Sequence, residues 1–302
     1  MSDPGAGSTA SVAAPFPGVL GPARPGRTRF LRAVRRTPAA VFGAATVGMV
    51  VLVALAAPWL APYDPVAQIA TPLLPPGGEH LAGTDEFGRD ELSRLIHGAR
   101  ISLYVGGLAV LIALGIGATS GVLAGYHGGW VDDATMRVMD VLLSLPALVL
   151  AIAITAVLGP TLTNAMVAIG IVYAPTFARV ARGPTLAVVQ VPYIEAARAI
   201  GCAHGTIVFR HVLPNVAAPI LVQTTVSLST AILTEAALSF LGVGTQPPTA
   251  SWGLMLSAAR QYMLIDPWIA VLPGCAIAVT VLGFNLLGDG LRDLLDPRMR
   301  TL

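Results

Sequence analysis

The pattern of apolar and polar positions divides the chain into six long apolar segments separated by shorter polar stretches. Each segment is close to the roughly 20 residues that an α-helix needs to cross the hydrocarbon core of a bilayer. The segments are residues 39–60, 101–126, 141–158, 162–178, 216–241 and 268–287. The fourth is short and could extend past Arg179. Residues 1–29 are instead rich in Gly, Pro, Ala and Ser without periodicity, which predicts a disordered tail.

Composition agrees with this pattern. Of the 302 residues, 55% are hydrophobic and only 11% are charged, whereas a soluble domain carries about a quarter charged residues. The mean hydropathy is +0.74. We therefore predict an all-α integral membrane protein with six transmembrane helices. The two cysteines, Cys202 and Cys275, are far apart and Cys275 lies in an apolar run, so neither a disulfide nor a zinc site is expected.

The arginines predict which side of the membrane each loop faces, because short cytoplasmic loops collect positive charge. If the N-terminus is cytoplasmic, fourteen of the eighteen arginines fall in cytoplasmic segments. Both termini are then cytoplasmic. The predicted order is a disordered basic cytoplasmic tail 1–38, a first transmembrane helix 39–60, an extracytoplasmic segment 61–100, a transmembrane core 101–288 and a cytoplasmic tail 289–302. The four outside arginines are Arg89, Arg94, Arg100 and Arg260.

A signal peptide is an alternative interpretation of the first span. The arginines before it, its apolar run and the small residues Ala54 and Ala56 loosely fit one. However, the run exceeds the usual 7–15-residue signal core, and five more spans follow. We interpret the first span as an uncleaved helix.

Glycines and prolines inside the spans predict features of helix packing. Gly117, Gly121 and Gly125 recur at four-residue spacing, so they share one helical face on which a second helix can approach closely. The spacing leaves open whether that helix belongs to the same subunit or to another. Three prolines are expected to kink their helices, namely Pro146, Pro175 and Pro273.

Ionisable residues are scarce inside the spans. Glu235 is the clear case, roughly 28 Å along its helix from the inside end. This depth predicts a position near the outer interface, within reach of water, and a structural hydrogen bond rather than a proton relay. A proton- or sodium-coupled carrier would hold carboxylates or broken helices near mid-membrane. The acidic run at 84–91 is expected to be a solvated surface, and the histidines lack ligand spacing, so no catalytic or metal site is predicted.

The chain contains no lysine, because all eighteen of its basic residues are arginine. A Walker A loop uses a lysine on the nucleotide phosphates, and Schiff-base chemistry also requires one. If this protein uses ATP, another subunit must hydrolyse it.

The cytoplasmic stretch YIEAARAIGCAHGTIVFRHVLP at 193–214 is water-facing although it lies between two apolar spans. Pro192 suits the first turn of a helix, and Glu195 then lies where a carboxylate favours the positive end of the helix dipole. Gly201 can take the left-handed conformation that ends a helix. Thr206 can cap a second short helix that Pro214 helps to terminate. The pattern predicts two short helices on the cytoplasmic face, serving either as an interfacial connector on lipid or as a docking surface.

This stretch resembles the EAA loop of ABC importer permeases, whose pattern is EAA, three residues, Gly, nine residues, then Ile-x-Leu-Pro. His211 stands at the isoleucine position, and the resulting RHVLPN is similar to peptide-type permeases. Further segments resemble the C-type subunit of the dipeptide/oligopeptide/nickel branch, at 83–103, 126–140, 238–253 and 284–298. The matching positions are Glu195, Ala196, Ala197, Gly201, Leu213 and Pro214.

The resemblance implies a permease with the type I ABC importer (MetI-like) fold in the bacterial inner membrane. Its EAA loop, 183–215, would couple to the ATPases through residues 190–214, and the segments 61–100 and 243–266 would face the binding protein. The implied partners are a B-type permease subunit, two ABC ATPase subunits that hold ATP and magnesium, an extracytoplasmic solute-binding protein and the lipid bilayer, but no nucleic acid. This chain itself would bind no cofactor and catalyse no reaction.

The resemblance further implies that the cargo is a short peptide, with nickel chelates or glutathione as alternatives. Other classes remain to be compared with this one. A secondary carrier or channel would work without an ATPase, a scaffold would leave uptake unchanged when deleted, and an exporter would normally carry its own ATPase domain.

Overall fold

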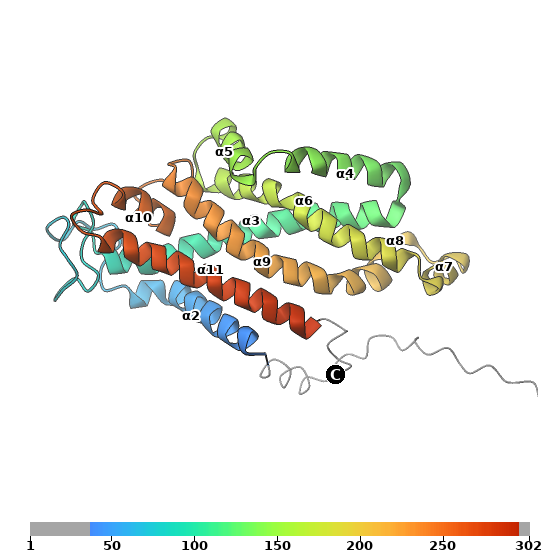
Figure 1. Cartoon of the computed structure of the whole chain (residues 1–302), viewed down its shortest axis with the longest axis horizontal. Helices are drawn as coiled ribbons and strands as arrows, with labels where there is room; N and C mark the ends of the chain where they lie inside the picture. The colour runs from blue at the N-terminus through green and yellow to red at the C-terminus, as the bar shows by residue number, and fades with distance from the viewer. Residues whose placement is uncertain (1–36, 296–302) are drawn as a thin grey trace, which may run out of the picture.

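The computed structural model describes residues 37–295, and all of the regular elements within that range are helices (Figure 1). The elements are α2 (Pro38–Leu60), α3 (Glu91–His127), α4 (Gly129–Leu143), α5 (Ala147–Leu158), α6 (Leu162–Val189), α7 (Pro192–Ala199), α8 (His204–Ile207), the π-helical turn η1 (Val208–Val212), α9 (Leu213–Phe240), α10 (Trp252–Ala259) and α11 (Trp268–Leu295).

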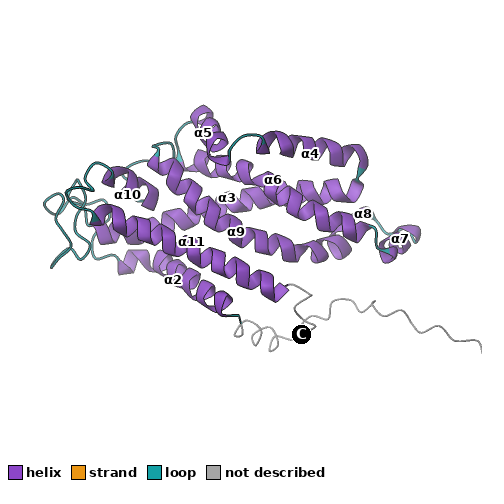
Figure 2. Ribbon diagram, in the orientation of Figure 1, coloured by secondary structure: helices purple, strands orange, loops and turns teal. Residues whose placement is uncertain are grey.

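The long helices run side by side as one bundle, and the connecting segments separate to its two ends. Figure 2 shows most of the loops gathered around α10, while α7 lies at the opposite end. We call these the α10 end and the EAA end. Five helical runs in the described part are long and apolar enough to span a membrane, and there are six if the bent pair α4–α5 is counted as one span. The predicted all-α membrane architecture is therefore confirmed.

The third predicted span, 141–158, is bent at Pro146, as the proline predicted. It is divided between α4 and α5, whose axes differ by 90° across a short break. Pro146 follows α4 at this break, and a proline both lacks an N–H and disfavours helical geometry in the residue before it. Pro175 and Pro273, by contrast, lie inside α6 and α11, which continue through them.

Three helices extend beyond the predicted apolar segments. α3 begins at Glu91, so the end of the segment predicted to be extracytoplasmic, 61–100, is already helical. Asp90 caps this helix because its carboxylate accepts hydrogen bonds from the Ser93 backbone N–H, at 2.8 Å, and from the Ser93 hydroxyl, at 2.7 Å. α6 continues to Val189, as the short fourth segment allowed, and α11 continues into the predicted tail 289–302. The predicted tail 1–38 lies outside the described residues except at its last two positions.

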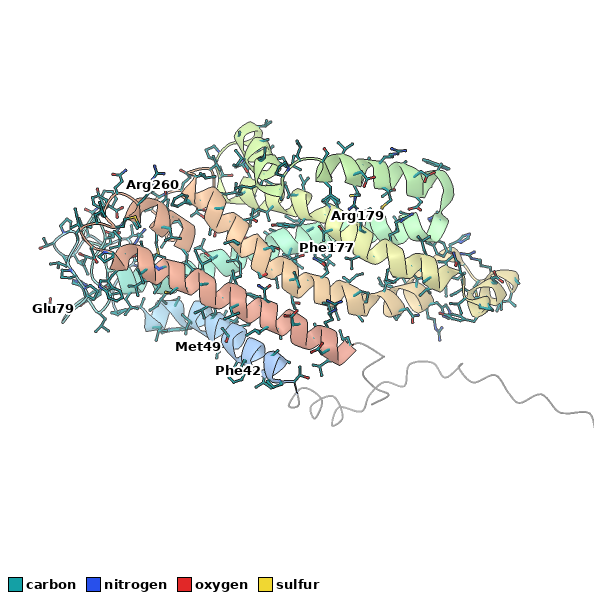
Figure 3. All side chains as sticks on the ribbon, in the orientation of Figure 1. Phe42, Met49, Glu79, Phe177, Arg179 and Arg260 are labelled. Atoms are coloured by element: carbon teal, nitrogen blue, oxygen red, sulfur yellow. The ribbon has the colours of Figure 1, made fainter. Side chains whose placement is uncertain are left out.

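The glycine face of α3 packs against α6 of the same chain. A side chain at Gly117 would collide with the backbone of Ala174, and one at Gly121 would collide with that of Ala178. Gly125 faces the next turn of α6 in the same row. Phe177, which is completely buried, lies beside this contact in the middle of the bundle (Figure 3). The close approach that the spacing predicted is thus made within one subunit.

Two ion pairs join α4 to α6. Arg182 binds Asp132 through both of its contacting nitrogens, each 2.5 Å from a carboxylate oxygen. Arg179 lies 2.6 Å from Asp140, and both side chains are about half exposed. These pairs hold α4 alongside the bundle although its sequence is less apolar than that of the long helices.

At the α10 end, the expectation of a solvated acidic surface at 84–91 is wrong. Asp85 is 4% exposed and binds two arginines, with Arg89 Nε at 2.6 Å and Arg94 Nε at 3.2 Å. His80 lies 2.9 Å from the capping carboxylate of Asp90. These residues pair with one another as the segment folds over the end of α3, because a buried charge needs a partner that compensates for its lost hydration.

Glu235 is also buried, at 1% exposure, so the expectation that water reaches it is wrong. The predicted structural hydrogen bond is present. Ser239 and Thr245 donate to one carboxylate oxygen at 2.8 and 3.1 Å, and Ser102 donates to the other at 3.3 Å. The carboxylate thereby joins α9, α3 and the loop 241–251.

Candidate functional site

The EAA segment, residues 190–212, forms one end of the bundle. It consists of α7, α8 and η1 and connects α6 to α9 (Figure 1). Three apolar side chains attach it to the neighbouring helices, because Ile194, Ile207 and Val212 are completely buried. Most of the other residues of the segment are exposed, so another molecule can contact them.

The first half of the segment folds as its residues predict. Pro192 occupies the first turn of α7 after an extended Val191, and Glu195 lies in that first turn. The Glu195 side chain is exposed, and no described side chain pairs with it. Its charge is therefore stabilised by the helix dipole alone and remains available to a partner.

Gly201 ends α7 in the left-handed conformation, with φ of +79°. Its N–H donates to the carbonyl of Arg198 at 3.0 Å, and the N–H of Cys202 donates to the carbonyl of Ala197 at 3.0 Å. These two bonds form a Schellman motif, which favours glycine at this position. Gly201 thus sets the angle at which the chain leaves α7.

The second half of the segment differs from the expectation. α8 begins after Ala203, and Thr206 lies inside the helix rather than capping it. Pro214 does not terminate the run, because α8, η1 and α9 continue as one helix from His204 to Phe240. Pro214 lies in the first turn of α9, and the π-helical turn before it changes the hydrogen-bonding register that a proline would otherwise interrupt.

The positions of the EAA pattern lie in the segment and, for Leu213 and Pro214, at the start of α9, and most of them are on the outer surface. The His211 ring packs beside the ring of Tyr193, with centroids 5.8 Å apart, and its carbonyl accepts a hydrogen bond from Asn215 at 2.6 Å. The exposed positions are Glu195, Ala196, Gly201, Leu213 and Pro214, whereas Ala197 and His211 are half-buried.

Two apolar residues that the sequence pattern did not single out are the most prominent on this surface. Ile200 is 80% exposed and Phe209 is 73% exposed. Large apolar side chains held in the open beside a low alanine surface are typical of a protein-binding site. The sequence does contain a signal for each of them. Ile200 is an apolar residue directly before the helix-ending Gly201, and Phe209 is an aromatic residue within the water-facing stretch 193–214.

Side chains that could bind a metal would have to gather at one point of the described structure. Among residues 37–295, no three metal-ligating side chains gather at one point. The segment presents an exposed surface and joins α6 to α9 through the backbone.

Comparison with known proteins identifies the chain. Residues 117–301 match the family described as "Binding-protein-dependent transport system inner membrane component", and residues 27–76 match "N-terminal TM domain of oligopeptide transport permease C". The chain belongs to this permease family. The match includes the whole EAA segment and the glycine face of α3.

Curated relatives cover nearly the whole permease. The dipeptide transport system permease protein of Alkalihalophilus pseudofirmus is 45% identical over 89% of this chain and 88% of its own. The di/tripeptide transport system permease protein of Pseudomonas aeruginosa is 48% identical, with 84% and 86% covered. A glutathione transport system permease protein of Escherichia coli is 47% identical over 90% of both chains.

A solved structure shares the fold. The inward-facing MetNI methionine ABC transporter contains a chain that superposes with a TM-score of 0.54 at 21% identity, covering 68% of this permease and 98% of that chain. The predicted type I importer fold is therefore confirmed.

Proposed function

We propose that this chain is the transmembrane permease subunit of an ATP-driven importer of short peptides, and that its EAA segment seats on separate ATPase subunits. The observation that carries the proposal is the EAA segment itself, which is anchored by three buried side chains and exposes Glu195, Ile200 and Phe209. Water-exposed Ile200 and Phe209 are unfavourable in isolation, and a partner surface that covers them removes that cost.

The arrangement of the helix ends supports the orientation. The start of α2 and the end of α11 both point toward the EAA end in Figure 1. With the arginine distribution, this supports a cytoplasmic EAA end together with both termini, and an extracytoplasmic α10 end that faces the solute-binding protein. Family membership supports residence in the bacterial inner membrane.

The proposed partners are inferred from the missing lysine and from membership of the permease family. Without lysine this chain has no Walker A loop, so ATP and magnesium belong to two partner ATPase subunits. A second, B-type permease subunit completes the translocation pathway, and a solute-binding protein delivers the cargo. Short peptides are the cargo that the dipeptide and di/tripeptide relatives favour, and the glutathione relative makes that tripeptide-like thiol the second candidate.

Uptake by the complete reconstituted complex tests this function. Proteoliposomes that contain both permeases and the ATPases, with the binding protein outside, are supplied with labelled dipeptide, tripeptide and glutathione. ATP-dependent accumulation of a peptide is expected. Accumulation without ATP, or failure of the ATPases to bind the permeases, would contradict the proposal.

A further inference from the structure

The helices α3, α6 and α9 pack against one another, and α3 differs from the other two because its backbone does not lead into the EAA segment. α6 ends at Val189, directly before the segment, and α9 follows η1 without a break. A displacement of the segment therefore reaches α6 and α9 through the backbone. α3 ends at His127, far away in sequence, and follows through its packing against α6 and through contacts of its own with the segment.

Tyr126 contacts the segment directly. It lies in the last turn of α3 and is 5% exposed. Its hydroxyl is 2.7 Å from Nδ1 of His204 in α8, and the guanidinium of Arg198 in α7 lies 5.3 Å from the centre of its ring. One aromatic side chain therefore touches both halves of the EAA segment, through a hydrogen bond and a cation–π contact.

α3 can carry a displacement along its whole length. It has 37 residues, so it is about 55 Å long at a rise of 1.5 Å per residue. Its glycine face interlocks with α6, and close-packed interiors shift as units rather than deform continuously.

At the α10 end, α3 is bound to the loop 241–251 and the start of α10. Ser102 donates to Glu235, which also accepts from Thr245 of the loop. The indole N–H of Trp252 donates to the Leu95 carbonyl at 2.9 Å, and its ring fits against Gly98, where a side chain would collide with it. The outer end of α3 is thus joined to the segment 241–252 by polar bonds and by shape.

We propose that Tyr126 is a positioning residue for transport. It makes α3 follow the EAA segment, and α3 passes that movement to the segment 241–252 through Ser102, Glu235 and Trp252. The inference rests on the proposed function, since it concerns how the ATPases move the permease. It adds a third connection to the two that the backbone of α6 and α9 provides.

The test measures the number of substrate molecules imported per ATP hydrolysed in reconstituted complexes. Tyr126→Phe keeps the ring over which Arg198 lies but loses the hydroxyl. We expect this ratio to fall by about threefold to tenfold, the equilibrium factor of one lost hydrogen bond. ATPase binding and protein yield should stay at wild-type levels. Tyr104→Phe is the matched control, because Tyr104 lies on the same helix, is 56% exposed, and its hydroxyl makes no hydrogen bond within residues 37–295.

A double-mutant cycle tests whether Tyr126 and His204 act through their mutual hydrogen bond or independently of each other. His204→Phe should lower the ratio as Tyr126→Phe does, and the double variant should be no worse than either single variant. Ser102→Ala, at the other end of α3, should also lower the ratio. A wild-type ratio in Tyr126→Phe, or full additivity with His204→Phe, overturns the inference. Failure of the proposed function is distinct from this, because wild-type complexes would then show no ATP-dependent import at all.

Discussion

The two ends of the bundle treat charge in opposite ways. At the α10 end, Asp85 and Arg94 are 4% and 3% exposed and bind each other. At the EAA end, Glu195, Arg198 and Arg210 are exposed, and Ile200 and Phe209 are uncovered beside them. The α10 end pairs the buried charges of residues 80–94 with one another, although one buried carboxylate oxygen of Asp266 at the same end has no hydrogen-bond partner in the described part of the chain. The EAA end leaves charged and apolar side chains exposed, where a second protein can cover them.

This difference separates stability from coupling. Removing one member of a buried ion pair leaves its partner charged and unhydrated, which destabilises the fold. Removing an exposed side chain costs the isolated subunit little, because water replaces what it touched. Substitutions at the two ends should therefore give different phenotypes, and the following predictions test that contrast.

The largest effect is expected for Asp85→Ala. This substitution leaves Arg89 and Arg94 buried without their shared carboxylate, at a cost of about 3–5 kcal/mol. Thermal unfolding and the yield of monodisperse protein should both fall sharply. Glu79→Ala, at an exposed position of the same end (Figure 3), is the control and should match wild type. Wild-type stability of the Asp85 variant would show that the buried cluster is not what holds this end together.

The glycine face between the two ends comes next. Gly121→Ala forces a methyl group into the backbone of Ala178 in α6, and overpacking of this kind costs about 1–3 kcal/mol. Gly115→Ala is the control on the same helix, because nothing lies within 4 Å of its added carbon. It should be neutral or slightly stabilising. Equal melting temperatures for the two variants would contradict the close α3–α6 contact.

Gly201→Ala should have a smaller effect on stability and a larger one on coupling. The left-handed conformation costs a residue other than glycine about 1–2 kcal/mol, so the angle after α7 should change. We expect a reduced ratio of transport to ATP hydrolysis. Gly205→Ala is the control, because Gly205 lies in the same segment, has no positive φ and has open space around it. Its ratio of transport to ATP hydrolysis should match wild type. Normal coupling in Gly201→Ala, with normal assembly, would remove this glycine from the account.

The smallest effect on the isolated subunit is expected for Phe209→Ala, within about 0.5 kcal/mol of wild-type stability. Its effect on assembly should be larger, because an apolar anchor at the centre of an interface contributes about 1–2 kcal/mol or more to binding. Titration of purified ATPase subunits measures this loss of affinity. An unchanged affinity would place Phe209 outside the interface.

The sequence predicted the apolar elements well and the polar ones poorly. The first span, 39–60, agrees with α2 to within one residue. An uninterrupted apolar run of this length is itself the requirement for a membrane-spanning helix, so no tertiary contact is needed to predict it. The bend at Pro146 was also predicted, from the proline alone. The buried pairs at 84–91 were not predicted, because burial of a charge depends on partners that the fold brings together. Ser102 and Glu235 are 133 positions apart, and no local pattern connects them.

The candidate site shows the same division. The left-handed Gly201 followed from local backbone chemistry, and it is present. The cap at Thr206 was wrong because the helix that contains it is continuous with α9, a tertiary property. The link from Tyr126 to His204 crosses 78 positions, so it was not visible before the structure.

Single-cysteine labelling tests the difference between the two ends most directly. In a complex whose permease has Cys202 and Cys275 replaced by serine, cysteines are placed separately at Gly205 and Gly78, both exposed positions without positive φ. We predict that the cysteine at 205 crosslinks to an ATPase subunit and resists an impermeant reagent applied from outside, while the cysteine at 78 is labelled from outside and does not crosslink to the ATPase. Outside labelling at 205, or an importing complex in which 205 never crosslinks to the ATPase, would contradict the account.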